Sequence, residues 1–292
     1  MVPQSLKEIL QTEISSKLKS TVTIDSFSPL VGGDINEAFR LQTSSGLFFM
    51  KFNSVIRYPD MFKKEATGLR LLADTGGVKV PGVVLYGQSE DDIFLVLEYI
   101  GPGQRKVSFW SDFGRSLARM HRHSSETFGL DHDNFMGSLY QSNQRHVSWR
   151  DFFTQERLEP MVRMARDGGY INRETVPAFE RLYRRLHDIF PEEPPALIHG
   201  DLWTGNQMVD KQGNACLIDP AVHYGHREMD IAMSRLFGSF AEEFYDAYHA
   251  EYPLDKGWQE RVDICNLYPL LVHVNLFGEG YVGGVERIVR RF

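Results

Sequence analysis

The hydrophobic pattern of the chain changes near Gly101. Before this residue, short runs rich in β-branched and aromatic residues are separated by turn residues, whereas apolar residues after it mostly recur at helical spacing. This segregation predicts an α+β fold, with a small antiparallel sheet in one lobe and a mainly helical second lobe. Gly101, Pro102 and Gly103 form the best boundary, which predicts lobes spanning residues 1–101 and 102–292.

The first lobe is predicted to begin with an amphipathic helix over residues 5–20, opened by a capping box of Ser5 and Glu8. A second helix carries Glu65 on a stripe that is otherwise apolar, so this carboxylate is expected to point inward. The strand-like runs span residues 21–30, 37–43, 47–53, 83–87 and 92–100, and the second helix spans residues 59–74.

The second lobe combines predicted helices with two short strand-like pieces, and the loop HGDLWTGNQMVD (199–210) lies between those pieces. Ser148 and Asp151 form a capping-type helix start. Helices are expected over residues 109–121, 148–166 and 172–190, and the strand-like pieces cover residues 196–199 and 215–219.

The loop has the residue order of a kinase catalytic loop, H-x-D-x-x-x-x-N, with Asn206 five positions after Asp201. An Asp at this place can accept the proton of an attacking hydroxyl, and an Asn can offer a neutral oxygen to a metal ion. Asp219 ends the second strand-like piece, where kinases place a carboxylate that holds Mg²⁺. Each residue alone is typical of a turn, but their order favours a phosphoryl-transfer site. We therefore predict Asp201 as the general base, Asn206 and Asp219 as Mg²⁺ ligands, and ATP as the donor.

A predicted phosphate-binding pair lies in the first lobe. Lys51 is in a strand-like run and Glu65 is in the next helix, the order of the kinase Lys–Glu pair that positions the α- and β-phosphates. Either residue alone would more often be solvated, so the order is what favours function. The turn that precedes them is expected to cover the phosphates with backbone N–H groups, although it lacks full G-x-G-x-x-G spacing. This turn consists of Gly32, Gly33, Asp34, Ile35 and Asn36.

Charge and composition argue against several other classes of protein. The formal net charge is −7 and no long Lys/Arg run is present, so neither nucleic acid nor an anionic membrane is expected as a partner. The start lacks a signal-peptide pattern and no apolar run is long enough to cross a bilayer, which predicts a soluble, cytoplasmic protein. Cys216 and Cys265 are expected to be reduced, and His121 and His123 lack further ligands at metal spacing, so no zinc site is predicted.

With these motifs in place, the sequence resembles the fructosamine and ketosamine kinases, relatives of aminoglycoside phosphotransferases and choline kinases, over nearly the whole chain. HGD and IDP replace the HRD and DFG of protein kinases, as in this small-molecule branch. The resemblance implies a protein-kinase-like two-lobed fold and phosphorylation of the sugar O3 of a ketoamine, free or protein-bound, to an adduct that decomposes and frees the amine. The segments that carry it are GGDINEAF (32–39), MKFN (50–53), HGDLWTGN (199–206), LIDPAV (217–222) and LVHVNLFGEGY (271–281).

The resemblance also implies a hinge that reads adenine through backbone groups, formed by Leu97, Glu98, Tyr99 and Ile100. Asp230, in a predicted helix, is expected either to accept backbone N–H groups of the catalytic loop or simply to begin that helix.

The acceptor site is predicted from position alone. Trp203 lies between the presumed base and the presumed metal ligand, so its ring is expected to contact the sugar or amine part of the acceptor, with ordinary packing as the alternative. His273 and Asn275 fall in an apolar C-terminal stretch and are candidate acceptor residues, with satisfied core polar groups as the alternative.

Two other functions stay open at the level of sequence. The same phosphate machinery would serve a kinase for another small alcohol, such as an aminoglycoside, choline or a sugar. The chain could also be a silent nucleotide-binding pseudokinase, but a silent domain need not keep a catalytic base. The preferred ketoamine and the oligomeric state are not indicated.

Overall fold

The computed structural model describes residues 2–30 and 35–292, and the chain divides into two compact units. The first unit reaches Val107 and includes Met208–Ile218, whereas the second comprises Ser108–Gln207 and Asp219–Phe292. The expected boundary after Gly101 therefore differs from the observed division. Backbone hydrogen bonds explain why the later segment joins the first unit, because Gly103 N donates to Val209 O (3.0 Å) and Leu217 N donates to Lys79 O (2.9 Å).

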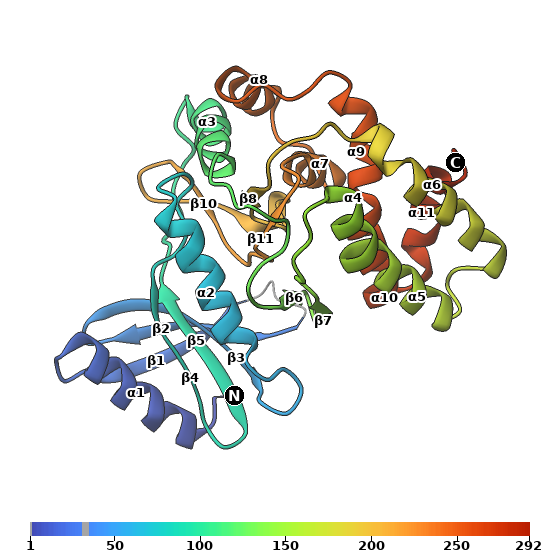
Figure 1. The fold of residues 1–292 in the computed structure, drawn as a ribbon. Coiled ribbons are helices and arrows are strands. Elements are labelled where there is room, and N and C mark those ends of the chain that lie inside the picture. Colours follow the sequence, from blue (N-terminus) through green and yellow to red (C-terminus); the bar gives the residue numbers. More distant parts are fainter. Residues whose placement is uncertain (1, 31–34) are drawn as a thin grey trace. The chain divides into compact units, whose positions relative to one another are not determined.

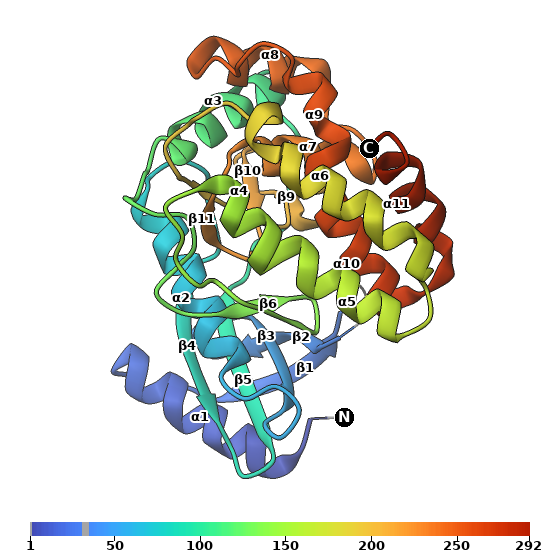
Figure 2. The same ribbon diagram turned by 45° about the vertical axis from the view of Figure 1, so that its right-hand side comes forward.

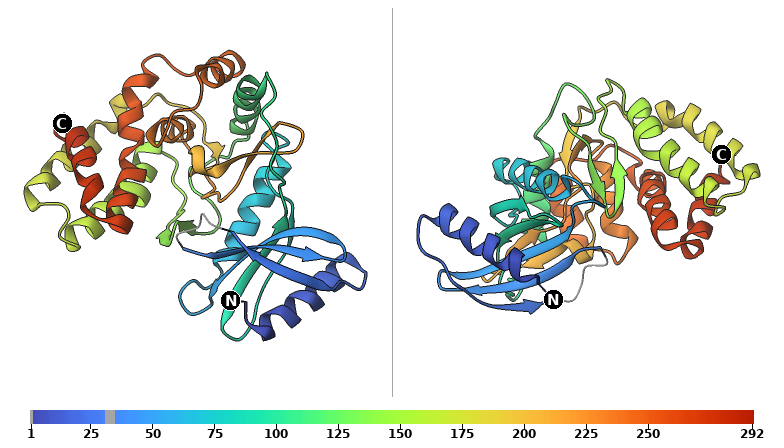
Figure 3. Two further views of the ribbon diagram at one scale, coloured as in Figure 1. Left: turned by 180° about the vertical axis from the view of Figure 1, so that it is seen from behind. Right: turned by 90° about the horizontal axis from the view of Figure 1, so that it is seen from below.

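The first unit contains a 5-stranded antiparallel sheet in the order β1-β2-β3-β5-β4 (Figure 1). Figure 3 shows α1 running beside this sheet. The predicted strands are confirmed, whereas the predicted capping box is wrong, because Glu8 accepts a hydrogen bond from Gln4 Nε2 (3.0 Å) at a helix that begins at Gln4. The elements are α1 (Gln4–Leu18), β1 (Ile24–Pro29), β2 (Glu37–Thr43), β3 (Gly46–Ser54), α2 (Met61–Asp74), β4 (Val83–Gln88) and β5 (Asp92–Glu98).

The two-residue period of β3 separates its apolar side chains from its lysine. Met50 and Phe52 pack with Leu10 of α1 in one buried core. Lys51 lies between them and therefore points to the opposite face of the sheet. Helix α2 packs against β4 and β5 and carries the glutamate that meets this lysine.

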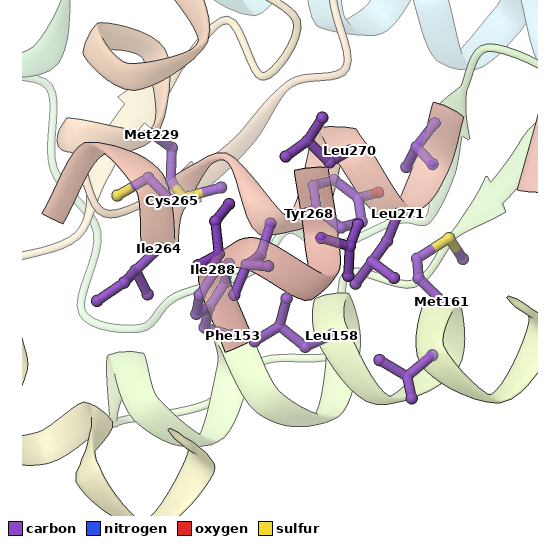
Figure 4. Packing of buried hydrophobic residues seen from close by; sticks show 14 of the residues in the cluster. Phe153, Leu158, Met161, Met229, Ile264, Cys265, Tyr268, Leu270, Leu271 and Ile288 are labelled. Atoms are coloured by element: carbon purple, nitrogen blue, oxygen red, sulfur yellow. The ribbon is translucent and has the colours of Figure 1, made fainter. Parts of the chain in front are cut away.

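The second unit is mainly helical, as predicted. Helix α10 packs against α5 and α11, and α11 packs against α6 (Figure 2). Figure 4 shows Leu271 of α10 near Tyr268, and Phe153 near Ile288 of α11, within one buried cluster. The helices are α3 (Phe109–His121), α4 (Trp149–Phe152), α5 (Glu159–Asp167), α6 (Val176–Ile189), α7 (Glu228–Leu236), α8 (Glu242–Glu251), α9 (Trp258–Cys265), α10 (Leu267–Phe277) and α11 (Val282–Val289), and a π-helical turn (Phe153–Leu158) joins α4 to α5.

Within residues 35–292, six further strands are short. Strand β8 pairs with β11 and β6 pairs with β7, both antiparallel, while β9 and β10 form a further two-stranded sheet. The sequence indicated only β8 and β10, because a strand of three residues is too short to show a period of two. The strands are β6 (Asn134–Met136), β7 (Leu139–Gln141), β8 (Ala196–Ile198), β9 (Gln207–Val209), β10 (Ala215–Leu217) and β11 (His223–Gly225).

Two further sequence-based expectations concern whole-chain properties. Cys216 and Cys265 are both buried free thiols, as expected. Throughout residues 2–30 and 35–292, no helix combines the length and the apolar composition that a bilayer crossing requires.

Candidate active site

The catalytic loop follows β8, and its two predicted polar residues lie together. Asn206 donates from Nδ2 to the backbone carbonyl of Asp201 (2.9 Å) and to its Oδ2 atom (2.8 Å). A short helical turn, Thr204–Asn206, brings the amide back to the aspartate across the predicted spacing. With both contacts made by the amide nitrogen, the amide oxygen of Asn206 is the atom that can accept a cation.

Asp230, in α7, supports the start of this loop. It is 1 % exposed and accepts hydrogen bonds from the backbone N–H groups of His199 (2.7 Å) and Gly200 (2.9 Å), so the predicted buttress is confirmed. The ring of His121 lies 3.1 Å from the same carboxylate and 2.8 Å from the Tyr248 hydroxyl. Burial favours a higher pKa for Asp230, but the hydrogen bond and charge of His121 and the backbone donor outweigh it and lower that pKa. The role of His121 was missed because its partners are distant in sequence.

Gly200 is required by the close approach of two chain segments. Its φ is +84°, and a Cβ atom at this position would lie 2.2 Å from the carbonyl oxygen of Ala221. The same segments are joined by a hydrogen bond from Ala221 N to His199 O (2.9 Å). The HGD form of the loop therefore has a steric cause, since only glycine leaves room for this crossing.

Asp219 adopts a left-handed backbone conformation, with φ +53°, which is uncommon for a residue other than glycine. Its carboxylate influences the presumed base. Burial is the largest cause that raises the pKa of Asp201 to about 7; the charges of Asp219 and Asp230 raise it further, and the hydrogen bond from Asn206 opposes them. A carboxyl group that titrates near neutrality is suited to accept and release a proton at physiological pH.

The second unit offers oxygen ligands that fit a hard cation bound together with a nucleotide. It offers the amide oxygen of Asn206 and the carboxylate of Asp219, which are oxygen donors of the kind that Mg²⁺ prefers. Among the residues that the structure describes, no group of three or more His, Cys, Asp or Glu side chains is arranged to hold a metal. A kinase-type Mg²⁺ site does not need such a group, because phosphate oxygens and waters complete the coordination.

Trp203 belongs to a surface cluster of rings that the sequence did not reveal. A Cβ atom at Gly205 would lie 2.3 Å from the Trp203 ring, which therefore lies over the loop backbone. The ring meets Phe237 edge to face, with 6.0 Å between centroids. Phe237 is 4.5 Å from His273, which also contacts Tyr281 (4.9 Å). With Phe277, which is 53 % exposed, these rings form what we call the aromatic cluster: Trp203, Phe237, His273, Phe277 and Tyr281.

His273 and Asn275, both on α10, have different surroundings. His273 Nδ1 lies 2.7 Å from the Pro269 carbonyl, so the neutral ring carries its proton on Nδ1 and presents Nε2 as an acceptor. Burial lowers the pKa of His273 and favours this neutral form. Asn275 Nδ2 donates instead to the Met161 carbonyl (3.0 Å). The geometry thus joins His273 to Trp203 through Phe237, and it gives Asn275 a partner within the fold.

In the first unit, the predicted pair of Lys51 and Glu65 is present. Lys51 Nζ lies 2.7 Å from Glu65 Oε1, and the two side chains are only 6 % and 12 % exposed. Phe62 of α2 covers the ammonium, with 5.7 Å from Nζ to the ring centroid. A buried ion pair of this kind fixes the direction of the lysine, although pairing alone is weak evidence of stability.

The other predicted nucleotide contacts are only partly described. Gly32, Gly33 and Asp34 lie outside the described residues. Asn53 Nδ2 donates to the Ile35 carbonyl and to Asn36 Oδ1, both at 2.8 Å, which ties the end of this turn to β3. In the presumed hinge, Glu98 N donates to Gly82 O (2.8 Å), Tyr99 is half-buried and Ile100 is buried. Their adenine-reading role stays a prediction.

The chain is similar to known proteins over nearly its whole length. The family model "Fructosamine kinase" matches residues 6–292. The "Probable ketoamine kinase" of Enterococcus faecium is 38% identical over 266 residues, which cover 90% of this chain and 94% of that protein. The chloroplastic protein-ribulosamine 3-kinase of Arabidopsis thaliana is 36% identical over 263 residues, which cover 88% of this chain and 79% of that protein.

Solved structures agree with the expected fold. A candidate fructosamine-3-kinase from Haemophilus somnus has a TM-score of 0.88 at 28% identity, covering 97% of this chain and 96% of that chain. A thermostable mutant of the aminoglycoside phosphotransferase APH(4)-Ia has a TM-score of 0.61 at 16% identity, covering 96% of this chain and 97% of that chain. This likeness concerns the fold alone. The kinase-like α+β fold is thereby confirmed. Because the family model and the relatives span the motifs of both units, the chain belongs to the fructosamine kinase family.

Proposed function

We propose that the chain is an ATP-dependent kinase that phosphorylates a sugar hydroxyl, O3, of a ketoamine such as a fructosamine or a ribulosamine. The observation that carries this proposal is the geometry of the catalytic loop in a member of this family. The Asp201 carboxylate is held by Asn206, and the loop backbone before it is held by Asp230. A pseudokinase would have no need of a base positioned in this way.

In the proposed reaction, Asp201 accepts the proton of the substrate hydroxyl while the hydroxyl oxygen bonds to the γ-phosphorus of ATP. The bond from that phosphorus to the bridging oxygen breaks, and ADP leaves. Lys51, directed by Glu65, binds the phosphates of the nucleotide. Asn206 and Asp219 would hold Mg²⁺, which neutralises charge that develops on the phosphate oxygens.

The two units would divide these tasks. We assign nucleotide binding to the first, including the hinge at Glu98, Tyr99 and Ile100, and we assign catalysis and acceptor binding to the second. A cytoplasmic location and the absence of nucleic-acid and membrane partners are part of the proposal and rest on the charge and composition of the sequence.

The aromatic cluster is the proposed acceptor surface, because it begins two positions after the base and offers ring faces and the His273 Nε2 acceptor. Ring faces suit the C–H faces of a sugar and the alkyl part of an amine. Asn275 is kept as a candidate acceptor residue, although its hydrogen bond to Met161 supplies a structural reason for it.

Trp203→Ala is expected to raise the acceptor KM by about threefold to tenfold, since an aromatic contact contributes roughly 1 kcal/mol. The KM for ATP should stay unchanged. Both KM values are measured by steady-state kinetics in which the acceptor and ATP are varied in turn. Trp110→Ala, which removes a half-buried indole from α3, is the matched control. An equal loss of ATP affinity, or no change for the acceptor, would assign Trp203 to packing.

The proposed function is tested by an acceptor screen with ATP and Mg²⁺. Synthetic fructosamines and ribulosamines are compared with an aminoglycoside, choline and free sugars, and ADP release is coupled to NMR assignment of the phosphorylated carbon. We expect ketoamine-dependent ADP release and a phosphate on O3. Preference for another alcohol would replace the substrate assignment, and ATP binding without turnover on any acceptor would favour the pseudokinase.

A further inference from the structure

Buried amide side chains of the hairpin β6–β7 reach the backbone that follows Asp219. Asn134 Nδ2 donates to the carbonyl of Val222 at 2.8 Å. Gln141 Nε2 approaches the carbonyl of Ala221 at 3.3 Å. Both side chains are buried, so water does not replace these bonds when they are lost. Two consecutive carbonyls, two and three residues beyond Asp219, are therefore held from one hairpin.

The two amides are part of a larger network. Gln141 Nε2 donates to Asn134 Oδ1 (2.7 Å), and Asn143 Nδ2 donates to the same oxygen (3.0 Å). Tyr268 of α10 donates its hydroxyl proton to Gln141 Oε1 at 2.6 Å. Arg157 Nη2 donates to Asn143 Oδ1, also at 2.6 Å. We call Asn134, Gln141 and Asn143 the amide network, with Arg157 and Tyr268 as its anchors.

Arg157 is the charged anchor of this network. It lies in the π-helical turn and is fully buried. Burial lowers its pKa to about 10, so it stays protonated at neutral pH. Its Nη1 donates to the carbonyls of Ser142 (2.5 Å) and Glu156 (3.0 Å), and its Nη2 donates to the amide oxygen of Asn143, all of them neutral oxygens. A buried cation that loses hydrogen-bond partners is costly, so a movement that broke the bonds made by Nη1 and Nη2 would be opposed.

The amide network binds the chain just after Asp219, where the backbone is strained. Asp219 has φ +53°, and such a conformation persists only when its surroundings hold it. On one side, Ala221 N donates to His199 O (2.9 Å). On the other side, the amide network holds the carbonyls of residues 221 and 222. The direction of the Asp219 side chain depends on this backbone, since φ and ψ set the direction of the Cα–Cβ bond.

We propose that Asn134 and Gln141 are positioning residues for the metal site, acting through the backbone of residues 221–222 on Asp219. The inference rests on the proposed function only in its assignment of Asp219 to a divalent cation. In this proposal the hairpin β6–β7 supports catalysis indirectly, and none of its side chains needs to contact the nucleotide or the acceptor.

Binding of Mn²⁺, a spectroscopic substitute for Mg²⁺, tests this without turnover. Electron paramagnetic resonance measures free Mn²⁺ in the presence of the full-length protein and a non-hydrolysable ATP analogue. Asn134→Ala is expected to weaken Mn²⁺ binding by about tenfold, the effect of one lost buried hydrogen bond. Asn266→Ala is the matched control, because Asn266 is also buried and donates to a backbone carbonyl, that of Ala232 in α7 (3.0 Å). The control should lose thermal stability and keep its Mn²⁺ affinity.

Asp219→Asn separates the possible outcomes. If wild type and Asp219→Asn bind Mn²⁺ equally, the metal assignment itself is wrong and the present inference falls with it. If Asp219→Asn binds weakly and Asn134→Ala binds as wild type does, the positioning role alone is refuted. Equal weakening by Asn266→Ala would also refute it, since loosening of the fold would then suffice.

Tyr268→Phe provides a milder variant should Asn134→Ala not fold. It removes only the hydroxyl that donates to Gln141 and keeps the ring in the core. We expect Mn²⁺ binding to weaken by about twofold to fivefold. The effect should be smaller than that of Asn134→Ala, because Tyr268 acts on the backbone carbonyls only through Gln141 and because one hydrogen bond contributes about 1 kcal/mol. Unchanged affinity in this variant would overturn the proposal.

Discussion

Replacement of Asp201 by asparagine is expected to lower kcat by about two to four orders of magnitude, the range usual for a lost general base. The structure makes this substitution well suited to the question. Asn206 Nδ2 donates to Asp201 Oδ2 (2.8 Å), and the amide oxygen of an asparagine can accept the same bond. The loop should therefore keep its conformation while losing its charge and its ability to take a proton.

Two measurements on the same preparation decide this prediction. Calorimetry should show nearly unchanged affinity for the nucleotide with Mg²⁺, and ketoamine-dependent ADP release should fall. Asp210→Asn, in the first unit, is a charge control with its own hydrogen bonds to backbone donors. A variant at Asp201 that keeps more than about a tenth of wild-type turnover lies outside the range for a base and would end that assignment.

Substitution of Asp219 should lower turnover severely, but the choice of replacement matters because Asp219 has a left-handed backbone conformation. Asparagine tolerates φ +53° well, whereas alanine there costs roughly 1–2 kcal/mol. Asp219→Asn is therefore expected to fold normally and to lose at least about 100-fold in turnover, since a metal ion contributes several kcal/mol of transition-state stabilisation. Asp219→Ala should lose the same activity and also melt at a lower temperature.

Comparison of the two Asp219 variants by calorimetric melting and by kinetics separates chemistry from strain. Near-normal kcat in Asp219→Asn with ATP and Mg²⁺ would show that this carboxylate does not hold the metal. Equal melting temperatures of the two variants would mean that the surrounding hydrogen bonds compensate for the strained backbone.

Much of the fold and the central residues of the site could be predicted from sequence because their signals are local. The spacing of Asp201 and Asn206 lies within one loop, and the place of Glu65 on an apolar stripe is visible from helical periodicity. The structure contains the expected pair of Lys51 and Glu65, and it adds a hydrogen bond from Asn206 to Asp201 that was not predicted.

The features that were missed depend on contacts between distant segments. His121 meets Asp230 across 109 positions, and Asn134 meets Val222 across 88 positions. Neither pair has a spacing that a pattern could reveal. Phe237 packs between Trp203 and His273. Because most phenylalanines are buried for packing alone, the sequence gives no signal of this contact.

Gly200 has a consequence for how such an enzyme can be regulated. Protein kinases have arginine in the corresponding place of their catalytic loop, and their activation loops are ordered by pairing of arginines with phosphorylated residues. Here any side chain would collide with the Ala221 carbonyl, which lies 2.2 Å from the Cβ position. An arginine at position 200 would therefore require the backbone at Ala221 to move. A phosphate sensor built on an arginine at position 200 is thus incompatible with this backbone.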